Sequence, residues 1–464
     1  MSISRRTVIA GATGATVLTI AACTSTPSPA PTATVSPTPS RARPTAIARS
    51  HWSREPFSQG STSYLPVGGT AAHRARLAHP IAERLFFAGE ATSVEAPNQL
   101  EGARDTGVRA AEQIVRAASA GERIAVIGAG MAGAACARAL SAADLDVIVI
   151  EARDRVGGRV LSLDAAEWGL AVELGGMRAA AEGSSSLRDD LAEAGVPVRA
   201  LDSTARRAAD GAQIQHDGAR ERVLDRARAA AENFGYDVPL STALTALAPL
   251  GDDSEAGALS EEEAAAAAVA EIVGGRAGAL ARQLSAANGI DELAPRWDAA
   301  VGGSLQQYVA DLIDGIDVLR SSAVTALIYD DEGVAIRLGT GESISVDRVV
   351  ITIPLGVLKD GGVAFDPPLP AAHREAIASL GVGELETVAL RFEAATWSET
   401  AAIWHGDPTA EAIVSEWINL QSVAGAPVLV GLIGPQRVAI LEQLTDDELI
   451  DQVMDELAPF FRSA

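Results

Sequence analysis

The stretch RIAVIGAGMAGAACARALSAADLDVIVIE, from Arg123 to Glu151, decides the fold class. Residues 123–127 are mainly apolar and predict a short buried strand, and a helical pattern covers 134–143. A second apolar run, DVIVI, follows and ends at the acidic Glu151. Strand, glycine-rich turn, helix and strand in this order predict a βαβ unit in a parallel sheet.

Three glycines between the strand and the helix point to a dinucleotide. Gly128 permits a tight turn, Gly130 lets the backbone approach a pyrophosphate, and Gly133 lets the helix pack on the strand. The phosphates would lie at the positive N-terminal end of the helix. Glu151 is placed to accept hydrogen bonds from a ribose diol. A lone glycine triplet would be weak evidence, but the triplet, both strands, the helix and the terminal acid together predict a dinucleotide site.

Composition excludes several classes of function. The chain has 464 residues, enough for two or three domains with large cores. Its formal net charge of −24 argues against nucleic acid as a partner, because phosphate binding needs basic stripes. Six scattered His and two Cys show no metal-ligand spacing, and no Gly-x-Ser-x-Gly element suggests a hydrolase. We therefore expect no metal site.

The N-terminal residues resemble an export signal. A twin arginine at 5–6 precedes a short apolar stretch at 8–22 and then Cys23. That stretch is too short and too rich in Gly and Thr to span a bilayer well. The sequence IAAC at 20–23 resembles a bacterial lipobox, in which the Cys is lipidated after cleavage; a plain signal peptide is the alternative. We expect export by a twin-arginine-type signal and a lipoprotein on the extracytoplasmic side of the cell membrane, held there only by this anchor.

The residues after Cys23 form a linker. The segment 24–44 is rich in Pro, Ser and Thr and cannot build a core, so it would be an extended tether. Cys136 falls inside a helical pattern, where it would be a packed small hydrophobe. With Cys23 as the anchor, no disulfide is expected.

Three further motifs narrow the dinucleotide to FAD. EARDRVGGRV occupies 151–160, ELGGMR occupies 173–178, and ERLFFAGEATS, at 83–93, precedes the helical pattern NQLEGARDTGVRAAEQIV. With the glycine turn, these motifs resemble the flavin-containing amine oxidase superfamily, which includes monoamine, polyamine and L-amino acid oxidases. The resemblance covers most of the chain after the linker. It implies an α/β Rossmann-like FAD-binding domain with an α+β substrate domain.

The resemblance also implies which residues contact FAD. Glu90 would accept a ribityl hydroxyl, Arg159 would wrap the pyrophosphate, and Val324 would pair its backbone with the adenine. The helix beginning near 100–101 would point its N–H groups at the pyrimidine edge of the flavin and favour reduction. The alternatives are an ordinary Gly-rich loop at 151–160 and a surface turn acid at 90. The full set of implied contacts is Gly89, Glu90, Gln99, Leu100, Gly128, Gly130, Met131, Ala132, Gly133, Glu151, Ala152, Arg153, Gly157, Gly158, Arg159, Gly175, Gly176, Met177, Arg178 and Val324.

The order of the motifs is rotated relative to the superfamily. HWSREPFSQGSTSYLPVGG and ERLFFAGEATS, which close the chain in the family, here precede the motif that normally opens it. We expect a circularly permuted chain, with the old ends joined near RAASAGERIAV and new ends between Phe461 and about Arg43. Permutation requires original termini that lie close together and a new break in an exposed loop. A mis-ordered gene prediction or a fusion of fragments is the rival explanation.

By resemblance, the reaction oxidises a C–H bond beside the nitrogen of a primary or secondary amine or an L-amino acid. Hydride passes to flavin N5, the imine hydrolyses, and O2 regenerates the flavin with release of H2O2. Arg178 resembles the Arg that forks onto the substrate carboxylate in L-amino acid oxidases, since a guanidinium matches a carboxylate with two parallel donors. An Arg that serves FAD or a surface acid is an equal alternative.

Two departures from the family pattern bear on catalysis. Thr387 stands where most relatives carry a Lys that holds a water near flavin N5, so Thr387 joins Arg178 as a candidate catalytic position; Lys359 would fall in an outer loop. The aromatic sandwich of many relatives is also missing. A related dehydrogenase or isomerase without oxidase activity, or an inactive FAD-binding protein, is therefore the alternative function.

The sequence also predicts how FAD is held. Gly60 matches the Cys that binds flavin covalently in some relatives, so we expect non-covalent FAD.

The predicted organisation is an export signal at 1–23, a linker at 24–44, a substrate-domain strand at 45–57, an FAD-binding domain at 58–190, a helical substrate domain at 191–300, a return to the FAD-binding domain at 301–365 and the substrate domain at 366–464. Ser61, Thr62 and Gln99 replace rings of the sandwich, whereas packed positions are favoured for Tyr64, Trp397 and Trp404.

Overall fold

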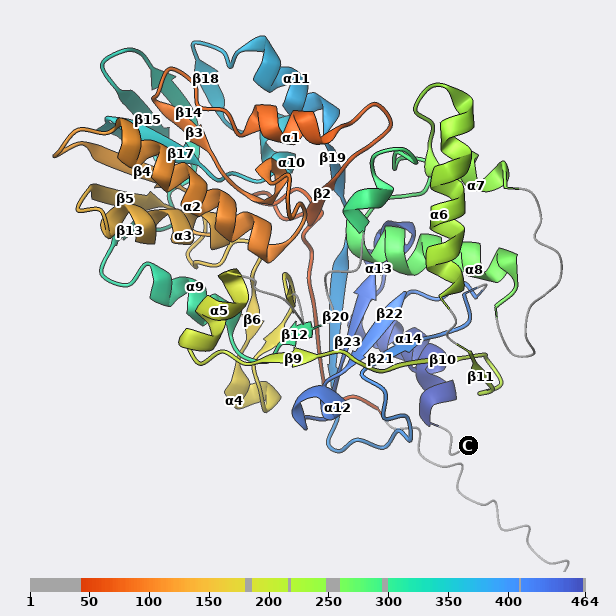
Figure 1. Cartoon of the computed structure of the whole chain (residues 1–464). Coiled ribbons are helices and arrows are strands. Elements are labelled where there is room, and N and C mark those ends of the chain that lie inside the picture. The colour runs from red at the N-terminus through yellow and green to blue at the C-terminus, as the bar shows by residue number, and fades with distance from the viewer. Residues whose placement is uncertain are drawn as a thin grey trace, which may run out of the picture. The chain divides into compact units, whose positions relative to one another are not determined.

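The computed structural model describes residues 43–179, 186–215, 218–247, 259–293, 299–408 and 410–461, with the backbone alone at 299–301. The predicted export signal (1–23) and nearly all of the predicted linker (24–44) lie outside the described residues. Two large sheets dominate the described part of the chain (Figure 1). One is parallel and carries the nucleotide motif, and the other is mixed and has seven strands.

The strands of the parallel sheet come from distant parts of the chain. All neighbouring pairs in it are parallel, and its edge pair aligns Phe86 with Val350. Each strand is a short apolar run, as expected where both faces of a sheet are covered. The predicted βαβ unit is confirmed. In spatial order the strands are β13 (Asp317–Leu319), β5 (Asp146–Ile150), β4 (Arg123–Ile127), β17 (Arg348–Ile351) and β3 (Leu85–Phe87).

Successive residues of these strands face two different cores. Val126 and Val350 pack beneath the helices α2 (Leu100–Ala117), α3 (Met131–Ser141) and α9 (Leu305–Leu312). Ile127 and Ile351 face the opposite side, toward the sheet β16–β15–β14–β18 and three helices. These elements are β14 (Val324–Tyr329), β15 (Val334–Leu338), β16 (Ser343–Val346), β18 (Ala364–Asp366), α1 (Ala71–Leu77), α10 (Leu355–Asp360) and α11 (Ala371–Ser379).

The nucleotide helix begins earlier than its sequence pattern predicts. We expected it over 134–143, but α3 runs from Met131 to Ser141 with Gly130 as its N-cap. Gly133 therefore lies in the first turn of the helix. A Cβ at Gly133 would stand 1.9 Å from the Gly128 carbonyl oxygen, so only glycine lets the helix approach the turn this closely. Cys136 is fully buried in α3, as predicted.

The seven-stranded sheet forms the core of the second half of the fold. Its order is β1 (Ala46–Arg49), β20 (Glu386–Arg391), β23 (Val428–Ile433), β22 (Glu416–Asn419), β21 (Ile403–His405), β10 (Thr204–Arg207) and β11 (Gln213–Ile214). One face packs on α13 (Pro435–Leu441) and α14 (Asp446–Phe461). The other face packs on Leu174 and Met177, which places the ELGGMR segment against this sheet.

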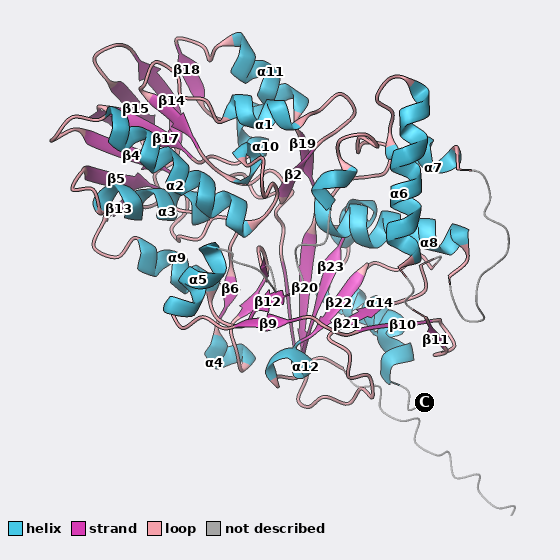
Figure 2. Cartoon of the chain, in the orientation of Figure 1, coloured by secondary structure: helices cyan, strands magenta, loops and turns pink. Residues whose placement is uncertain are grey.

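The region 191–300 is only partly as predicted. It holds α6 (Ala219–Ala231), α7 (Leu240–Thr245), α8 (Glu261–Ala267) and a π-helix, η3 (Ala268–Ala277), as Figure 2 shows for its helical part. It also holds the strands β10 and β11, and β9 (Val198–Ala200), which the helical prediction missed. β10 exists because it pairs with β21, about 200 residues away in sequence. A capping box of Ser260 and Glu263 begins α8.

The segment 43–117 contributes to several sheets. β1 pairs with β20, β2 (Thr62–Tyr64) pairs with β19 (Gly381–Gly383), β3 closes the parallel sheet, and α2 lies beside α3 (Figure 1). Arg43 forms ion pairs with Asp447 and Asp451 in α14. Among the described helices, none has the length and apolar character needed to cross a bilayer.

Candidate cofactor and active site

A large pocket extends from the carboxyl ends of β4 and β5 to the strands β20 and β23. It contains about 1310 Å³ of space without protein atoms, including its opening to solvent. Parallel sheets bind their ligands at this edge. Most of the predicted contact residues line it, namely Gly89, Glu90, Gln99, Leu100, Gly128, Gly130, Met131, Ala132, Glu151, Arg153, Gly157, Gly158, Arg159, Gly175, Gly176, Met177, Arg178 and Thr387.

Two glycine turns face each other at the nucleotide end of the pocket. Gly128 has φ +103° and Gly157 has φ +110°, a region that favours glycine. The backbones of Gly130 and Gly157 form a bridge, and a Cβ at Gly158 would lie 3.1 Å from the Cα of Gly130. These turns leave exposed backbone beside the N-terminus of α3, which suits a pyrophosphate.

Glu151 ends the second strand of the nucleotide motif and is buried. Its Oε2 accepts a hydrogen bond from the backbone N–H of Ala129 at 2.7 Å, and its Oε1 accepts one from Arg153 N–H at 2.8 Å. Each carboxylate oxygen has a second lone pair, so the group can still accept from a ribose hydroxyl. The carboxylate therefore fixes the glycine turn as well as facing the pocket.

Glu90 joins two segments that lie far apart in sequence. Arg159 Nη1 donates to Glu90 Oε1 at 3.0 Å, and Ser63 Oγ donates to Oε2 at 2.5 Å. Arg74 in turn donates to Ser63 Oγ at 2.7 Å and forms two hydrogen bonds to Glu292. Glu90 is 6% exposed, so the surface-acid alternative is wrong. The GEATS turn thus faces the same pocket as the glycine turns.

The far end of the pocket is built from the seven-stranded sheet. Thr387 on β20 and Leu432 on β23 are aligned partners, and both line the pocket. Thr387 N–H donates to Ser50 Oγ at 2.8 Å, which ties β20 to the segment after β1. Gly275 and Arg276, from the π-helix, complete this wall. Leu385, which directly precedes β20, also lines the pocket.

Comparison with known proteins identifies the family. The model for flavin containing amine oxidoreductases matches residues 33–115 and 131–464, and the model for pyridine nucleotide-disulphide oxidoreductases matches 83–172. The chain belongs to the flavin-containing amine oxidoreductase family. It is an FAD-dependent oxidoreductase, and the predicted fold class and cofactor are confirmed.

Among curated relatives, polyamine oxidase 4 of Oryza sativa subsp. japonica is 29% identical over 78% of this chain and 76% of its own length. Polyamine oxidase 2 of Arabidopsis thaliana is 27% identical over 71% of this chain and 72% of its own length. A solved structure of putrescine oxidase bound to putrescine superposes with a TM-score of 0.57 at 21% identity, covering 73% of this chain and 81% of the other. At this identity, the similarity to putrescine oxidase shows a shared fold only.

The amine oxidoreductase pocket fits FAD by its own chemistry. The glycine turns would hold the pyrophosphate, Glu151 the ribose and Glu90 the ribityl chain. Thr62 Oγ1 is buried, lines the pocket and has no hydrogen-bond partner among the described residues. Gly60 carries no side chain that could form a link, and a Cβ there would stand 2.1 Å from Val382 Cγ1. FAD is therefore bound without a covalent bond at this position.

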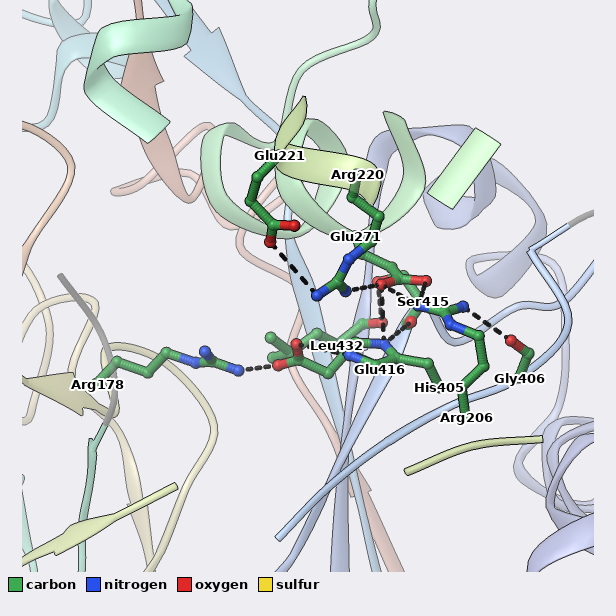
Figure 3. A network of polar contacts seen from close by, with 10 residues as sticks. All are labelled: Arg178, Arg206, Arg220, Glu221, Glu271, His405, Gly406, Ser415, Glu416 and Leu432. Atoms are coloured by element: carbon green, nitrogen blue, oxygen red, sulfur yellow. Dashed lines mark hydrogen bonds and ion pairs between the residues drawn. The ribbon is translucent and has the colours of Figure 1, made fainter. Parts of the chain in front are cut away.

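Arg178 lies at the end of a buried polar network (Figure 3). Its Nη2 forms an ion pair with Glu416 Oε1, and each side chain is 12% exposed. His405 follows, with Nε2 3.7 Å from Glu416 Oε2 and Nδ1 3.3 Å from Glu271 Oε2. Burial lowers the pKa of His405 to about 3, so its imidazole is neutral near pH 7. For this guanidinium, a substrate carboxylate on one hand and FAD or a surface acid on the other were equal alternatives, and the structure pairs it with a carboxylate of the protein.

Glu271 fixes the π-helix at the other end of this network. Arg206 Nη2 lies 2.6 Å from Glu271 Oε1, and Arg220 pairs with Oε2. Burial opposes ionisation of Glu271, but attraction to His405 in its protonated form and to the Arg206 and Arg220 guanidinium groups outweighs burial and lowers the pKa of the carboxyl. Glu271 is four residues before Gly275, so the cluster holds the turn of helix that borders the pocket.

Several predicted residues lie outside the pocket wall. Gly133, Ala152 and Val324 do not line it; Gly133 serves packing, and Val324 belongs to the core beneath the parallel sheet. Lys359, expected in a loop, lies in the last turn of α10 and donates to the carbonyl oxygens of Ile377, Ala378 and Leu380. The last carbonyl groups of a helix lack partners within it, and Lys359 supplies donors to those at the end of α11.

The aromatic residues for which packed positions were favoured, Tyr64, Trp397 and Trp404, lie in or against cores. Trp404 is fully buried and stacks on Phe460 with ring centroids 4.9 Å apart, and Trp397 packs edge-on against Trp404. Tyr64 is 6% exposed and would collide with a Cβ at Gly381. The packed interpretation of these rings is confirmed.

Sequence reasoning missed several residues of the pocket wall. They are Trp52, Ser58, Asn98, Ala103, Val160, Gly275, Arg276, Thr352, Pro354, Leu385 and Leu432. Asn98 carried a usable signal, because Asn before a helix start tolerates a left-handed backbone. Gly275, Arg276 and Leu432 carried none, because only the packing of the π-helix on β23 brings them to the pocket.

Proposed function

We propose that this amine oxidoreductase oxidises an amine that lacks an α-carboxylate. The observation that carries the proposal is the Arg178–Glu416 ion pair, which neutralises the guanidinium that would otherwise recognise an amino acid. Opening that buried pair to admit a substrate carboxylate would leave Glu416 as an uncompensated charge, at a cost of several kcal/mol. The similarity to plant polyamine oxidases supports the same substrate class.

FAD would accept a hydride from the carbon beside the amine nitrogen and pass the electrons to O2. The chain's own residues bind and orient: the glycine turns and the N-terminus of α3 hold phosphates, Glu151 and Glu90 hold hydroxyl groups, and the N-terminus of α2 faces charge that develops on reduction. Thr387 and Leu432 form the wall against which the amine would lie. Thr387 cannot take up a proton as a lysine would, so it orients by hydrogen bonding alone.

The test is a substrate panel with the purified FAD-loaded protein. Peroxide release and flavin bleaching are measured with monoamines, diamines, polyamines and L-amino acids. We expect peroxide with amines and at least tenfold lower kcat/KM for amino acids of matched chain length. Peroxide from amino acids alone would contradict the proposal, and bleaching under nitrogen without peroxide in air would favour the dehydrogenase alternative.

We also propose that the chain is exported and lipid-anchored, as the twin arginine at 5–6 and the IAAC sequence at 20–23 suggest. Such an export route carries folded proteins, which suits an enzyme that takes up FAD before export. Membrane fractionation of cells producing the wild type and Cys23→Ala tests this. Equal recovery of both in the membrane fraction would contradict a lipid anchor.

We further propose that the chain is a circular permutation of the family order. The family model matches in two separate pieces, and the segment 43–117 pairs with strands that follow it by hundreds of residues. The junction between α2 and β4 is a short turn around Gly121, as expected of joined termini.

A further inference from the structure

Asn98 is the pocket residue whose polar atoms are least satisfied by the protein. Both Nδ2 and Oδ1 are shielded from solvent and lack a hydrogen-bond partner among the described residues, yet Asn98 lines the pocket. A buried amide without partners costs about 1–3 kcal/mol, so a molecule in the pocket that supplies the missing partners would be bound more tightly. No role for it follows from the sequence motifs.

The backbone holds Asn98 in place at a further cost. Its φ of +55° lies in the left-handed region, where a residue other than glycine costs up to about 1–2 kcal/mol. The preceding turn is fixed: Ala96 N–H donates to Ser93 Oγ at 3.1 Å, and a Cβ at Gly102 would stand 1.8 Å from the Ala96 carbonyl oxygen. The amide therefore cannot leave the pocket without disrupting this packing.

The position of Asn98 along the pocket indicates which part of FAD it meets. Gly107 of α2 packs on Ala132 beside the phosphate turn, and seven residues of helix place Leu100 about 10 Å further along. There Leu100 touches Gly176, near Arg178 and the substrate wall. Asn98 precedes Leu100 by two residues, so it lies at the flavin-ring end and not beside Glu151, where the adenosine belongs.

A carboxamide presents one acceptor and one donor side by side. Its complement is a donor flanked by an acceptor, and at the flavin-ring end of FAD that pattern occurs on the imide edge of the ring, N3–H between two carbonyl groups. We propose that the Asn98 carboxamide recognises this imide edge, with Oδ1 accepting from N3–H and Nδ2–H donating to a ring carbonyl. Because folding has already removed water from the amide, binding FAD does not have to desolvate it again. Both proposed hydrogen bonds therefore contribute to the affinity for FAD and to the reduction potential of the bound flavin.

The test compares FAD with 3-methyl-FAD, in which a methyl group replaces the N3 hydrogen. Dissociation constants for both flavins are measured by fluorescence titration of apoprotein, for the wild type and for Asn98→Gly. Glycine accepts a φ of +55° without strain, so this variant removes the amide and keeps the turn. We expect N98G to bind FAD about tenfold more weakly, the loss for two neutral hydrogen bonds. We expect the wild type to discriminate between the flavins about tenfold and N98G less than about threefold.

The matched control is Asp144→Gly, an exposed residue at φ +57° in the turn after α3. It should bind both flavins as the wild type does. Equal FAD affinity of N98G and wild type, or equal discrimination by both, would overturn the proposal. The proposal rests on FAD as cofactor and not on the substrate: wild-type protein that takes up no FAD would overturn the proposed function as well.

A second variant gives a readout that folding defects would not mimic. Asn98→Asp keeps the shape of the side chain but replaces the Nδ2 donor with a negative charge. Because the ring becomes more negative on reduction, the midpoint potential of the bound flavin should fall in N98G and fall further in N98D. An unchanged or higher potential in N98D would contradict a contact with the imide edge.

Discussion

Glu173 is a buried carboxyl group whose protonation is coupled to folding. It is 4% exposed and accepts hydrogen bonds at Oε1 from Ser162 Oγ at 2.5 Å and from Leu305 N–H at 2.9 Å. Its Oε2 has no partner among the described residues. Burial raises the pKa of Glu173 to about 7, so the carboxyl is protonated in the folded protein under mildly acidic conditions.

This gives a pH dependence with a definite sign. Between about pH 4 and 7 the folded state keeps a proton that the unfolded state has released, so stability falls as pH rises through that window. Glu173→Gln keeps the Oε1 acceptor and removes the titration. Relative to the wild type, the free energy of unfolding of the variant should rise by about 2–3 kcal/mol when the pH is changed from 5 to 8.5.

Urea unfolding at the two pH values measures this gain. Glu456, whose pKa burial also raises to about 7, is present in both proteins and cancels from the comparison. Parallel pH profiles for the variant and the wild type would show that Glu173 does not carry a proton in the folded state.

The contact between α2 and α3 positions two walls of the pocket. A Cβ at Gly107 would stand 2.1 Å from the Ala132 carbonyl oxygen, so the helices touch backbone to backbone at this point. α2 carries Gln99 and Leu100 at one end, and α3 carries the first turn that faces the phosphates. A side chain inserted between the two helices at this point would therefore push them apart and move both groups of cofactor contacts.

Gly107→Ala tests this element contact. Helix propensity alone would make alanine stabilising by about 1 kcal/mol, but the clash should reverse the sign and cost about 1–3 kcal/mol. We expect a lower thermal midpoint and weaker FAD binding. Val115→Ala is the control, because Val115 is exposed on the same helix. A G107A variant as stable as V115A would mean that the helices can separate freely.

The arrangement of the whole molecule allows the proposed permutation to be reversed. A chain of 122–461, a linker and 43–118 would restore the family order of motifs. Arg43 pairs with Asp451, ten residues before the end of α14, so the linker must span roughly 15 Å. About eight Gly/Ser residues reach this distance.

We expect the reordered chain to bind FAD as tightly as the parent and to melt within a few degrees of it. As a control, a chain that begins at residue 126 would split β4 and should bind no FAD. Failure of the reordered chain to fold, with a folded parent, would show that the present chain order contributes to the fold. Circular dichroism and flavin absorbance measure both properties.

Much of the nucleotide half was predictable because its signals are local. The strand–turn–helix–strand pattern around Gly128 lies within 29 residues, and its glycines follow from backbone geometry. The helix bounds were less accurate, because the start of α3 depends on how closely Gly133 approaches Gly128. The strand β10 was missed for a similar reason: it forms by pairing with the distant strand β21, and β11 then pairs with β10.

By itself, the sequence determined the class of cofactor, the βαβ unit and the family, since each depends on residue types at short, fixed spacings. Only the tertiary structure decided that Glu416 pairs with Arg178, that Glu90 pairs with Arg159, and that the amide of Asn98 has no partner among the described residues. These contacts join residues as many as 238 positions apart, and long-range pairs form through the packing of two sheets and their helices. Local patterns carry no information about which of many distant groups fills a given side chain's hydrogen bonds, so the partner of each pocket residue had to be read from the folded chain.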